Sequence, residues 1–211
     1  MRTPPKLDDL HPWLRAKVEE LAWMHNVAFP ERALCLIWGH RSPEEQQAAF
    51  KAGRSRLDGI NRFSLHNLSP SLAADLWVYT EDDGPEDMTL TEGRPDKSLG
   101  MKLQLLQKGS LKNYYYPMAK LAEDVGLEAG AFWTRLKDGP HIQVPKTDRI
   151  ILAQTALRDA GWNVDVDGRL GPQTKSAISS AAKEHGVRAS GSSLFPMSPA
   201  LWSCLNPEEE A

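Results

Sequence analysis

Residues 64–79 read Ser-Leu-His-Asn-Leu-Ser-Pro-Ser-Leu-Ala-Ala-Asp-Leu-Trp-Val-Tyr, and this stretch decides how the N-terminal part of the chain folds. Its second half, residues 73–79, is a short apolar run that predicts a β-strand. Asp75 interrupts the run, and a carboxylate inside an apolar strand is costly to desolvate unless it is paired or bound to a metal ion. His66 stands just before this strand. We therefore expect a polar site where the strand begins.

Short periodic segments on both sides of this stretch predict further helices and strands. The clearest is a helix that begins after Ser42, because Ser42 fits the N-cap, a proline follows it, and Glu45 completes a capping box. Gly53 supplies the stop signal of that helix. The other elements predicted for the N-terminal part are a helix over residues 12–26, strands over 33–38 and 141–144, an acidic surface insertion over 80–100 and a helix over 118–125.

The character of the chain changes after residue 146, where helical segments predominate. Apolar spacing indicates a helix that ends at Gly161 and a last helix near residues 198–205, with one further helix between them. The sequence thus predicts an α+β fold. Residues 1–146 form a domain with a small antiparallel sheet and flanking helices, and residues 147–211 form a small all-α domain of three helices.

Composition excludes several classes of protein. With 211 residues, 41% apolar content and a formal net charge of −3, the chain can form a core but shows no basic stripe for nucleic acid. Its two cysteines, Cys35 and Cys204, exclude a disulfide framework and a four-cysteine zinc site. No segment is apolar enough to span a membrane, and the N-terminus lacks a signal peptide pattern, so we expect synthesis in the cytoplasm without membrane insertion. Any metal ion must be held by histidines and carboxylates.

A second histidine with unusual neighbours, His141, follows Asp138-Gly139-Pro140 at the start of a predicted strand. Taken alone, a histidine at a strand end is more often a hydrogen-bonded structural residue than a ligand, and Asp138-Gly139-Pro140 fits an ordinary turn. Two imidazoles and one carboxylate nevertheless have the composition of a catalytic zinc site, in which three protein ligands leave a fourth position open. His66, Asp75 and His141 are therefore candidates for one metal site.

Three blocks of the sequence, in this order, resemble the zinc D-alanyl-D-alanine carboxypeptidases and L-alanyl-D-glutamate endopeptidases, a family that includes many phage endolysins. The blocks are Gly39-His40-Arg41-Ser42-Pro43-Glu44-Glu45-Gln46, then Ser64-x-His66 leading to Ala73-x-Asp75, and then Trp133 followed by Asp138-Gly139-Pro140-His141. Together they span about residues 7 to 145. Each block alone is common, whereas the ordered set is specific.

The resemblance assigns a role to each candidate residue. It implies that zinc (Zn2+) is bound by His66, Asp75 and His141, that Asp138 is the catalytic base, and that Arg41 contacts the substrate or the developing oxyanion. Two features depart from the family pattern. The first histidine and the aspartate are nine residues apart instead of seven, with Ser69-Pro70-Ser71 in the connection, although a two-residue insertion keeps Asp75 on the same side of its strand. Asp138 stands where many relatives have glutamate.

The C-terminal part carries a pattern with two interpretations. Asn163-x-Asp165-x-Asp167-Gly168 looks like the start of a calcium loop, but the twelfth position is Thr174 instead of the bidentate glutamate. The same region resembles the three-helix peptidoglycan-binding module often attached to wall hydrolases, with Gly168 and Gly171 in tight turns and Thr174 as a helix cap. Such a module tethers an enzyme to an insoluble substrate. The alternative is a helical cap that only stabilises the first domain.

Together these features predict a zinc-dependent peptidoglycan peptidase of the phage endolysin type. We expect a monomer that is made in the cytoplasm of the infected host without a signal peptide and then released to the cell wall. The expected substrate bond is L-Ala–D-Glu, because cutting it detaches peptide stems from glycan, whereas removing terminal D-Ala leaves existing cross-links intact. The alternatives are a D-Ala-D-Ala carboxypeptidase of the same family and a non-catalytic, zinc-containing wall-binding protein.

Overall fold

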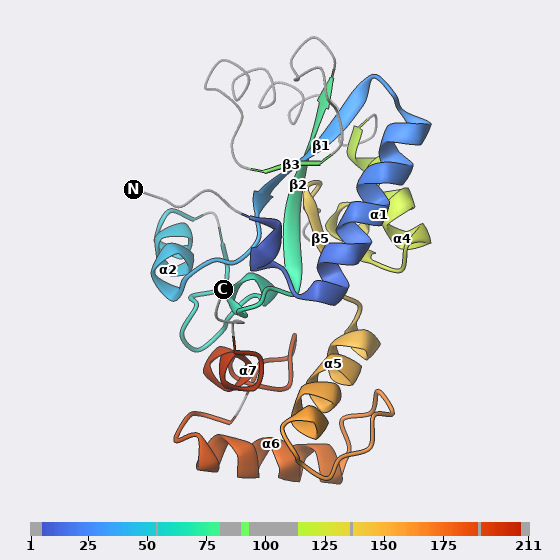
Figure 1. Cartoon of the computed structure of the whole chain (residues 1–211). Helices are drawn as coiled ribbons and strands as arrows, with labels where there is room; N and C mark the ends of the chain where they lie inside the picture. The colour runs from blue at the N-terminus through green and yellow to red at the C-terminus, as the bar shows by residue number, and fades with distance from the viewer. Residues whose placement is uncertain are drawn as a thin grey trace. The chain divides into compact units, whose positions relative to one another are not determined.

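The strand predicted at residues 73–79 is the central strand of the sheet, β2 (Ala73–Thr80), in the computed structural model of the chain (Figure 1). The structure describes residues 6–53, 55–80, 90–92, 114–135, 137–189 and 191–207. The chain divides into two compact units, one of Met1–Gly39 and Ala73–Val144 and the other of His40–Leu72 and Pro145–Ala211. The second unit thus includes residues 40–72 together with the C-terminal helices. The division into domains at residue 146 stays a prediction.

The first unit is built on a five-stranded sheet with the strand order β3-β1-β2-β5-β4. The strands besides β2 are β1 (Arg32–Trp38), β3 (Leu90–Glu92), β4 (Glu128–Ala129) and β5 (His141–Gln143). Strands β1, β2, β5 and β4 pair antiparallel, as predicted, whereas β3 pairs in parallel with β1. The sheet is therefore mixed instead of purely antiparallel. Strand β3 lies within the predicted insertion over residues 80–100, most of which is outside the described residues.

The pleat of β2 separates the main core from a face that carries polar residues. Leu76 and Val78 point to the core side and are buried, whereas Asp75 and Trp77, which alternate with them, are only partly buried. The register pairs Asp75 of β2 with His141 of β5, so both side chains project from the same face. The candidate site residues on these strands therefore lie on the side of the sheet away from Leu76.

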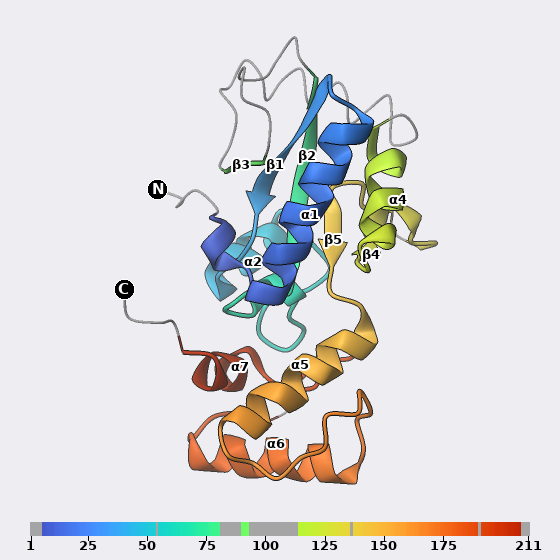
Figure 2. The same ribbon diagram turned by 45° about the vertical axis from the view of Figure 1, so that its right-hand side comes forward.

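Helix α1 (Pro12–Ala28) lies against the sheet and beside α4 (Tyr116–Asp124), as Figures 1 and 2 show from two directions. Its predicted start is confirmed, and its end comes slightly later than residue 26, at Ala28. Leu14, Val18 and Leu21 recur at helical spacing and are fully buried. The helical stripe thus docks α1 onto the core, which matches the amphipathic pattern in the sequence.

The second unit contains the helices α2 (Pro43–Lys51), α5 (Lys146–Asp159), α6 (Pro172–Glu184) and α7 (Pro199–Leu205). The predicted capping box is confirmed: Ser42 Oγ accepts from the N–H of Glu45, and the Glu45 carboxylate accepts from the N–H of Ser42, each at 3.2 Å. Helices α5 and α6 contact each other, and Figure 2 shows α5 above α6. Within the described part of the chain, no helix combines the length and apolarity that crossing a membrane requires.

The loop between α5 and α6 is held by the buried amide of Gln154. Its Nε2 donates to Oδ1 of Asp167 at 2.8 Å, and its Oε1 accepts from the backbone N–H groups of Asp167 and Gly168 at 3.1 and 2.8 Å. Oδ1 of Asp167, which also accepts from the N–H of Arg169 at 2.8 Å, is thus already bound by two protein donors. Neither Asp165 nor Asp167 belongs to a metal-binding group among the residues described. The geometry gives the calcium-loop interpretation no support.

The predicted role of Thr174 as a helix cap is wrong. Helix α6 begins at Pro172 with Gly171 as its N-cap, which places Thr174 in the first turn. The Thr174 hydroxyl instead donates to the carbonyl of Arg169 at 3.3 Å and accepts from Nε2 of Gln154 at 3.0 Å. Thr174 therefore joins the Gln154 network that closes the loop before the helix.

Helix α1 also buries an imidazole that makes no hydrogen bond. His25 is fully buried, and neither of its ring nitrogens has a partner among the residues that the structure describes. Burial, with a further contribution from the positive charge of Arg32 and against the charge of Glu31, lowers the pKa of His25 from 6.5 to about 4. The folded protein thus keeps His25 neutral at pH values where the unfolded chain takes up a proton.

We expect His25 to make the folded state sensitive to acid. Because the folded-state pKa is the lower one, the stabilisation is complete above pH 6.5 and is lost as the pH falls toward 4, by about 3 kcal/mol in the free energy of unfolding. Urea unfolding near neutral pH and near pH 4 should show a smaller loss in His25→Leu than in the wild type. The exposed His185→Leu is the control, and an unchanged pH dependence in His25→Leu would contradict the assignment.

Candidate metal centre

An aspartate and a histidine meet at the ends of two neighbouring strands. Asp75 lies on β2 and His141 begins β5, and the antiparallel register places them opposite each other. Nδ1 of His141 lies 3.0 Å from Oδ1 of Asp75. Their side chains are exposed by only 10% and 15%. The carboxylate within the apolar strand therefore has a close polar partner.

The third candidate, His66, lies in the short 3₁₀ turn η2 (Leu65–Asn67) and is buried. The side chain of Asn67 accepts from the N–H of Ser64 and donates to the carbonyl of Arg41, both at 2.8 Å. The carbonyl of His66 in turn accepts from the N–H of Arg41 at 2.7 Å. Hydrogen bonds on both sides thus fix the backbone that carries the His66 imidazole.

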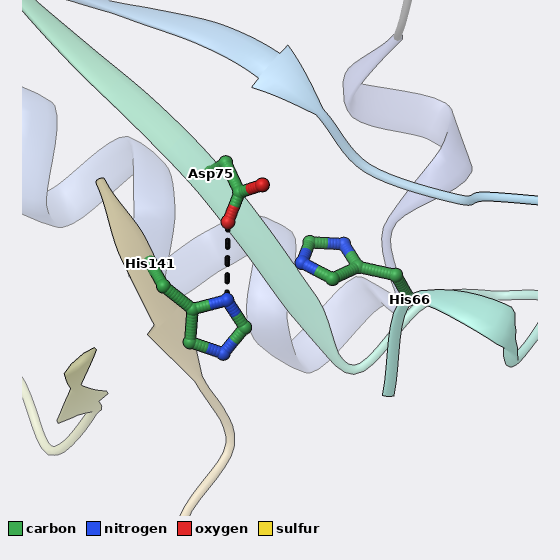
Figure 3. Close-up of side chains that lie close together, drawn as sticks. All are labelled: His66, Asp75 and His141. Carbon is green, nitrogen blue, oxygen red and sulfur yellow. Dashed lines mark hydrogen bonds and ion pairs between the residues drawn. The ribbon is translucent and has the colours of Figure 1, made fainter. Parts of the chain in front are cut away.

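The imidazoles of His66 and His141 and the carboxylate of Asp75 form one cluster (Figure 3). Each residue offers one ligand atom, and these atoms all lie within 4.8 Å of one another. In a tetrahedral zinc site with bonds of about 2.1 Å, ligand atoms are about 3.4 Å apart, so side-chain shifts of about 1 Å suffice to share an ion. Within the described ranges, no other group of His, Cys, Asp or Glu meets this criterion. The three residues chosen from the sequence therefore come together, and their role as zinc ligands stays a prediction.

Each ring nitrogen of His141 faces an oxygen that can accept a hydrogen bond, and such oxygens also attract a cation. Its Nδ1 faces Oδ1 of Asp75, and its Nε2 faces Oε1 of Gln143 at 3.2 Å. Both facing atoms are acceptors, an arrangement that suits a proton on Nε2 and either a proton or a metal ion on Nδ1. Gln143 is buried on the same side of β5 as His141. It thus orients the imidazole with Nδ1 toward Asp75.

The electrostatic surroundings of His141 favour positive charge. Burial lowers the pKa of His141, but the hydrogen bond and the negative charge of Asp75, together with the charge of Asp138 and the hydrogen bond to Gln143, raise it above its ordinary value. The carboxylates therefore outweigh desolvation. The same negative charges stabilise a metal cation at this position.

Asp138, the predicted catalytic base, lies in the turn before β5. Its N–H donates to the carbonyl of Gly130 at 3.0 Å, and its own carbonyl accepts from the N–H of His141 at 3.3 Å. Gly130 has to be glycine, because a Cβ atom there would lie 2.7 Å from the carbonyl oxygen of Asp138. This close approach keeps Asp138 beside His141, and its role as the base stays a prediction.

Arg41, predicted to contact the substrate, is oriented by a buried amide. Its Nη1 donates to Oε1 of Gln46 at 3.1 Å. Gln46 is fully buried, and its Nε2 donates to Oγ of Ser55 and to the carbonyl of Leu57, each at 2.7 Å. Oγ of Ser64 also donates to Oε1 of Gln46, at 3.5 Å. Arg41 is thus part of an ordered network, and nothing in the geometry tests its contact with a substrate.

Two residues near the site were not predicted from the sequence: Gln143, which contacts His141, and Glu128, which contacts Trp133. Gln143 could have been found, because strand alternation places it on the same side as His141. No local sequence pattern indicates Glu128, because it lies opposite Gln143 only through the pairing of β4 with β5. Glu128 accepts a hydrogen bond of 3.0 Å from Nε1 of Trp133, whose ring centroid lies 5.0 Å from that of His141. An aromatic side chain therefore flanks the imidazole.

The ligand set limits the choice of metal without fixing it. Two imidazoles and one carboxylate suit catalytic zinc, which takes three protein ligands and keeps one position open. The same set binds ferrous iron in oxygenases. The metal preference of the cluster is therefore a quantity to measure.

Comparisons with known proteins do not assign the chain to a family. No family model matches it, and no curated protein does. Among solved structures, the chain is similar to the L-Ala D-Glu endopeptidase ChiX of Serratia marcescens, with 23% sequence identity, a TM-score of 0.39, and coverage of 67% of this chain and 85% of that one. A TM-score of 0.39 does not establish a common fold. The functional argument therefore rests on the side chains.

Metal binding is the first test of the cluster. We expect the purified protein to bind about one zinc ion per chain in preference to ferrous iron, and His66→Ala and His141→Ala to lose it, because each leaves two protein ligands. Loss of a group that only orients a ligand costs about 10- to 100-fold in affinity, so loss of a ligand should cost at least as much. Metal analysis after dialysis measures the content, with exposed His185→Ala as the control. Stoichiometric zinc in both variants would place the metal elsewhere.

Proposed function

We propose that this protein is a zinc-dependent peptidoglycan peptidase that hydrolyses an amide bond of the wall peptide stem. The observation that carries the proposal is the cluster of His66, Asp75 and His141, whose ligand atoms lie within 4.8 Å of one another. These residues come from two of the three sequence blocks that resemble zinc wall peptidases, and they follow one another in the order of that family. The orientation of His141 by Gln143 supports a site built for a metal ion.

The residues around the cluster suit amide hydrolysis. Bound zinc would activate a water molecule and polarise the scissile carbonyl as a Lewis acid. Asp138 takes the proton of the attacking water and returns it to the leaving amine. The backbone hydrogen bond between Asp138 and His141 supports this role, because it keeps the base at a constant spacing from a ligand. Arg41 supplies positive charge to the substrate or to the developing oxyanion.

We assign the L-Ala–D-Glu bond as the preferred substrate bond. Both this bond and D-Ala–D-Ala are amides, so the same ligands and base serve either reaction. Cutting L-Ala–D-Glu releases peptide stems from glycan and weakens the wall, whereas a carboxypeptidase leaves existing cross-links in place. The assignment therefore follows from a lytic role, in which the protein acts as a phage endolysin on the cell wall of the host.

The C-terminal helices α5, α6 and α7 are proposed to tether the enzyme to peptidoglycan. The sequence of α5, α6 and the loop between them resembles a wall-binding module, and a weak binder attached to an enzyme raises its effective concentration at an insoluble substrate. The Gln154 network gives Asp167 and Thr174 a structural use in place of calcium binding, which favours this interpretation over a calcium loop. The protein would act as a monomer after release from the host cytoplasm.

The catalytic base is tested by Asp138→Ala. We expect hydrolysis of purified peptidoglycan to slow by about 10² to 10⁴-fold, because the attacking water loses its proton acceptor. Zinc content should stay near one ion per chain, since Asp138 is not among the clustered ligands. Release of new amino groups measures the rate, and exposed Asp159→Ala is the matched control.

Two results would contradict parts of this proposal. Full activity in Asp138→Ala would contradict the assignment of Asp138 as the base, but it would not contradict the zinc site. Wild-type protein that binds walls and zinc but releases no amino groups would favour the non-catalytic, zinc-containing wall-binding protein.

The bond that is cut can be identified from the products. We expect mass analysis of digested peptidoglycan to show peptides with new D-Glu amino termini, because an endopeptidase cuts next to L-Ala. Treatment with a chelator should abolish these products, and added zinc should restore them. Free D-Ala as the sole product would instead identify the D-Ala-D-Ala carboxypeptidase.

A further inference from the structure

Helix α7 makes hydrogen bonds to the loop that follows His66. Nε1 of Trp202 donates to the carbonyl of Pro70 at 2.9 Å, and Oγ of Ser203 donates to the carbonyl of Ser69 at 3.2 Å. Both contacts lie within the second compact unit. The consecutive carbonyls of residues 69 and 70 therefore accept hydrogen bonds from two consecutive side chains of α7.

Helix α7 is itself held firmly, so it can restrain the loop. Trp202 is fully buried, and its ring meets that of Phe195 edge-on, with 5.0 Å between the centroids. Nη1 of Arg149, on α5, donates to the carbonyl of Leu194 at 2.8 Å. The N-cap of α7, Ser198, accepts from the N–H of Leu201 at 3.1 Å. The segment of Leu194 and Phe195 thus connects α7 to α5, which α7 also contacts directly.

The restrained loop returns to the residue next to His66. The N–H of Leu72 and Oγ of Ser71 donate to the carbonyl of Leu65, at 3.3 and 3.4 Å. Leu65, Leu68 and Leu72 are buried, which holds the loop against the interior. A shift of Pro70 would therefore be passed along a short, closed segment to His66. The connection from His66 to Asp75, which is two residues longer than in the family that the sequence resembles, begins with this loop.

We propose that α7 is a positioning element of the metal centre: Trp202 and Ser203 hold the loop of residues 65–72 and thereby set the place of His66. The inference rests on the proposed metal site, and it gives the C-terminal helices a task besides wall binding. A module that only tethers changes the effective concentration of substrate when it is altered. A positioning element also changes the affinity for the metal.

The test removes the two donors from α7 and keeps its packing. Trp202→Phe retains an aromatic ring without the N–H, and Ser203→Ala removes the hydroxyl. In the double variant we expect zinc affinity, measured by chelator competition, to fall roughly tenfold. Backbone amides of residues 65–72 should exchange with solvent severalfold faster in the metal-free protein, because local opening becomes easier. Ile178→Ala on α6 is the control, since Ile178 is buried and donates nothing to the loop.

Each outcome decides a separate question. If the double variant unfolds at a lower temperature but keeps its zinc affinity and the protection of residues 65–72, α7 only stabilises the fold and the inference is overturned. Equal effects in Ile178→Ala would overturn it as well, because general destabilisation would then explain them. If the wild-type protein binds no zinc, the proposed function fails. The exchange measurement still decides whether α7 holds the loop, because it uses the metal-free protein.

Discussion

The pairing of Asp75 with His141 across β2 and β5 is the interaction on which the site depends. A carboxylate among apolar neighbours raises the free energy of the folded state unless a donor or a positive charge faces it. The antiparallel register places His141 opposite Asp75, and Gln143 then engages the second ring nitrogen. A slip of β5 by one residue would turn His141 to the other face of the sheet and leave Asp75 without this partner. The polar pair therefore also specifies how these two strands align.

Much of the local structure could be predicted because its causes are local. The helix start at Ser42 was predicted correctly, since a capping box depends on residues within one turn. The strand around Asp75 and the meeting of His66, Asp75 and His141 were anticipated from an apolar run and from the order of three short blocks. A buried carboxylate is a signal that can be recognised before the fold is known, because its desolvation cost is large in any apolar strand.

The features that sequence analysis missed depend on pairings between distant residues. Strand β3 pairs in parallel with β1, and the three residues of β3 show no sequence pattern that indicates this partner. The contact of Trp202 with Pro70 joins residues 132 positions apart, and a tryptophan near the C-terminus does not show which carbonyl it will meet. Thr174 was assigned to the wrong position because a threonine next to a turn fits either an N-cap or the first helical turn. In the structure, Nε2 of Gln154 in the preceding helix donates to the hydroxyl of Thr174, and this bond belongs to the position in the first helical turn.

The backbones of the candidate ligands are held in two different ways. Asp75 and His141 sit opposite each other on paired strands, where the ladder fixes both backbones at once. His66 sits in a single turn followed by a loop, and such segments open at a lower free energy than strands in a sheet. Its position therefore depends on bonds from outside the turn: Arg41 binds its carbonyl, and the loop after it closes on Leu65. A loop of this length has many conformations when it is unrestrained, and the hydrogen bonds from Trp202 and Ser203 to the carbonyls of Pro70 and Ser69 limit them.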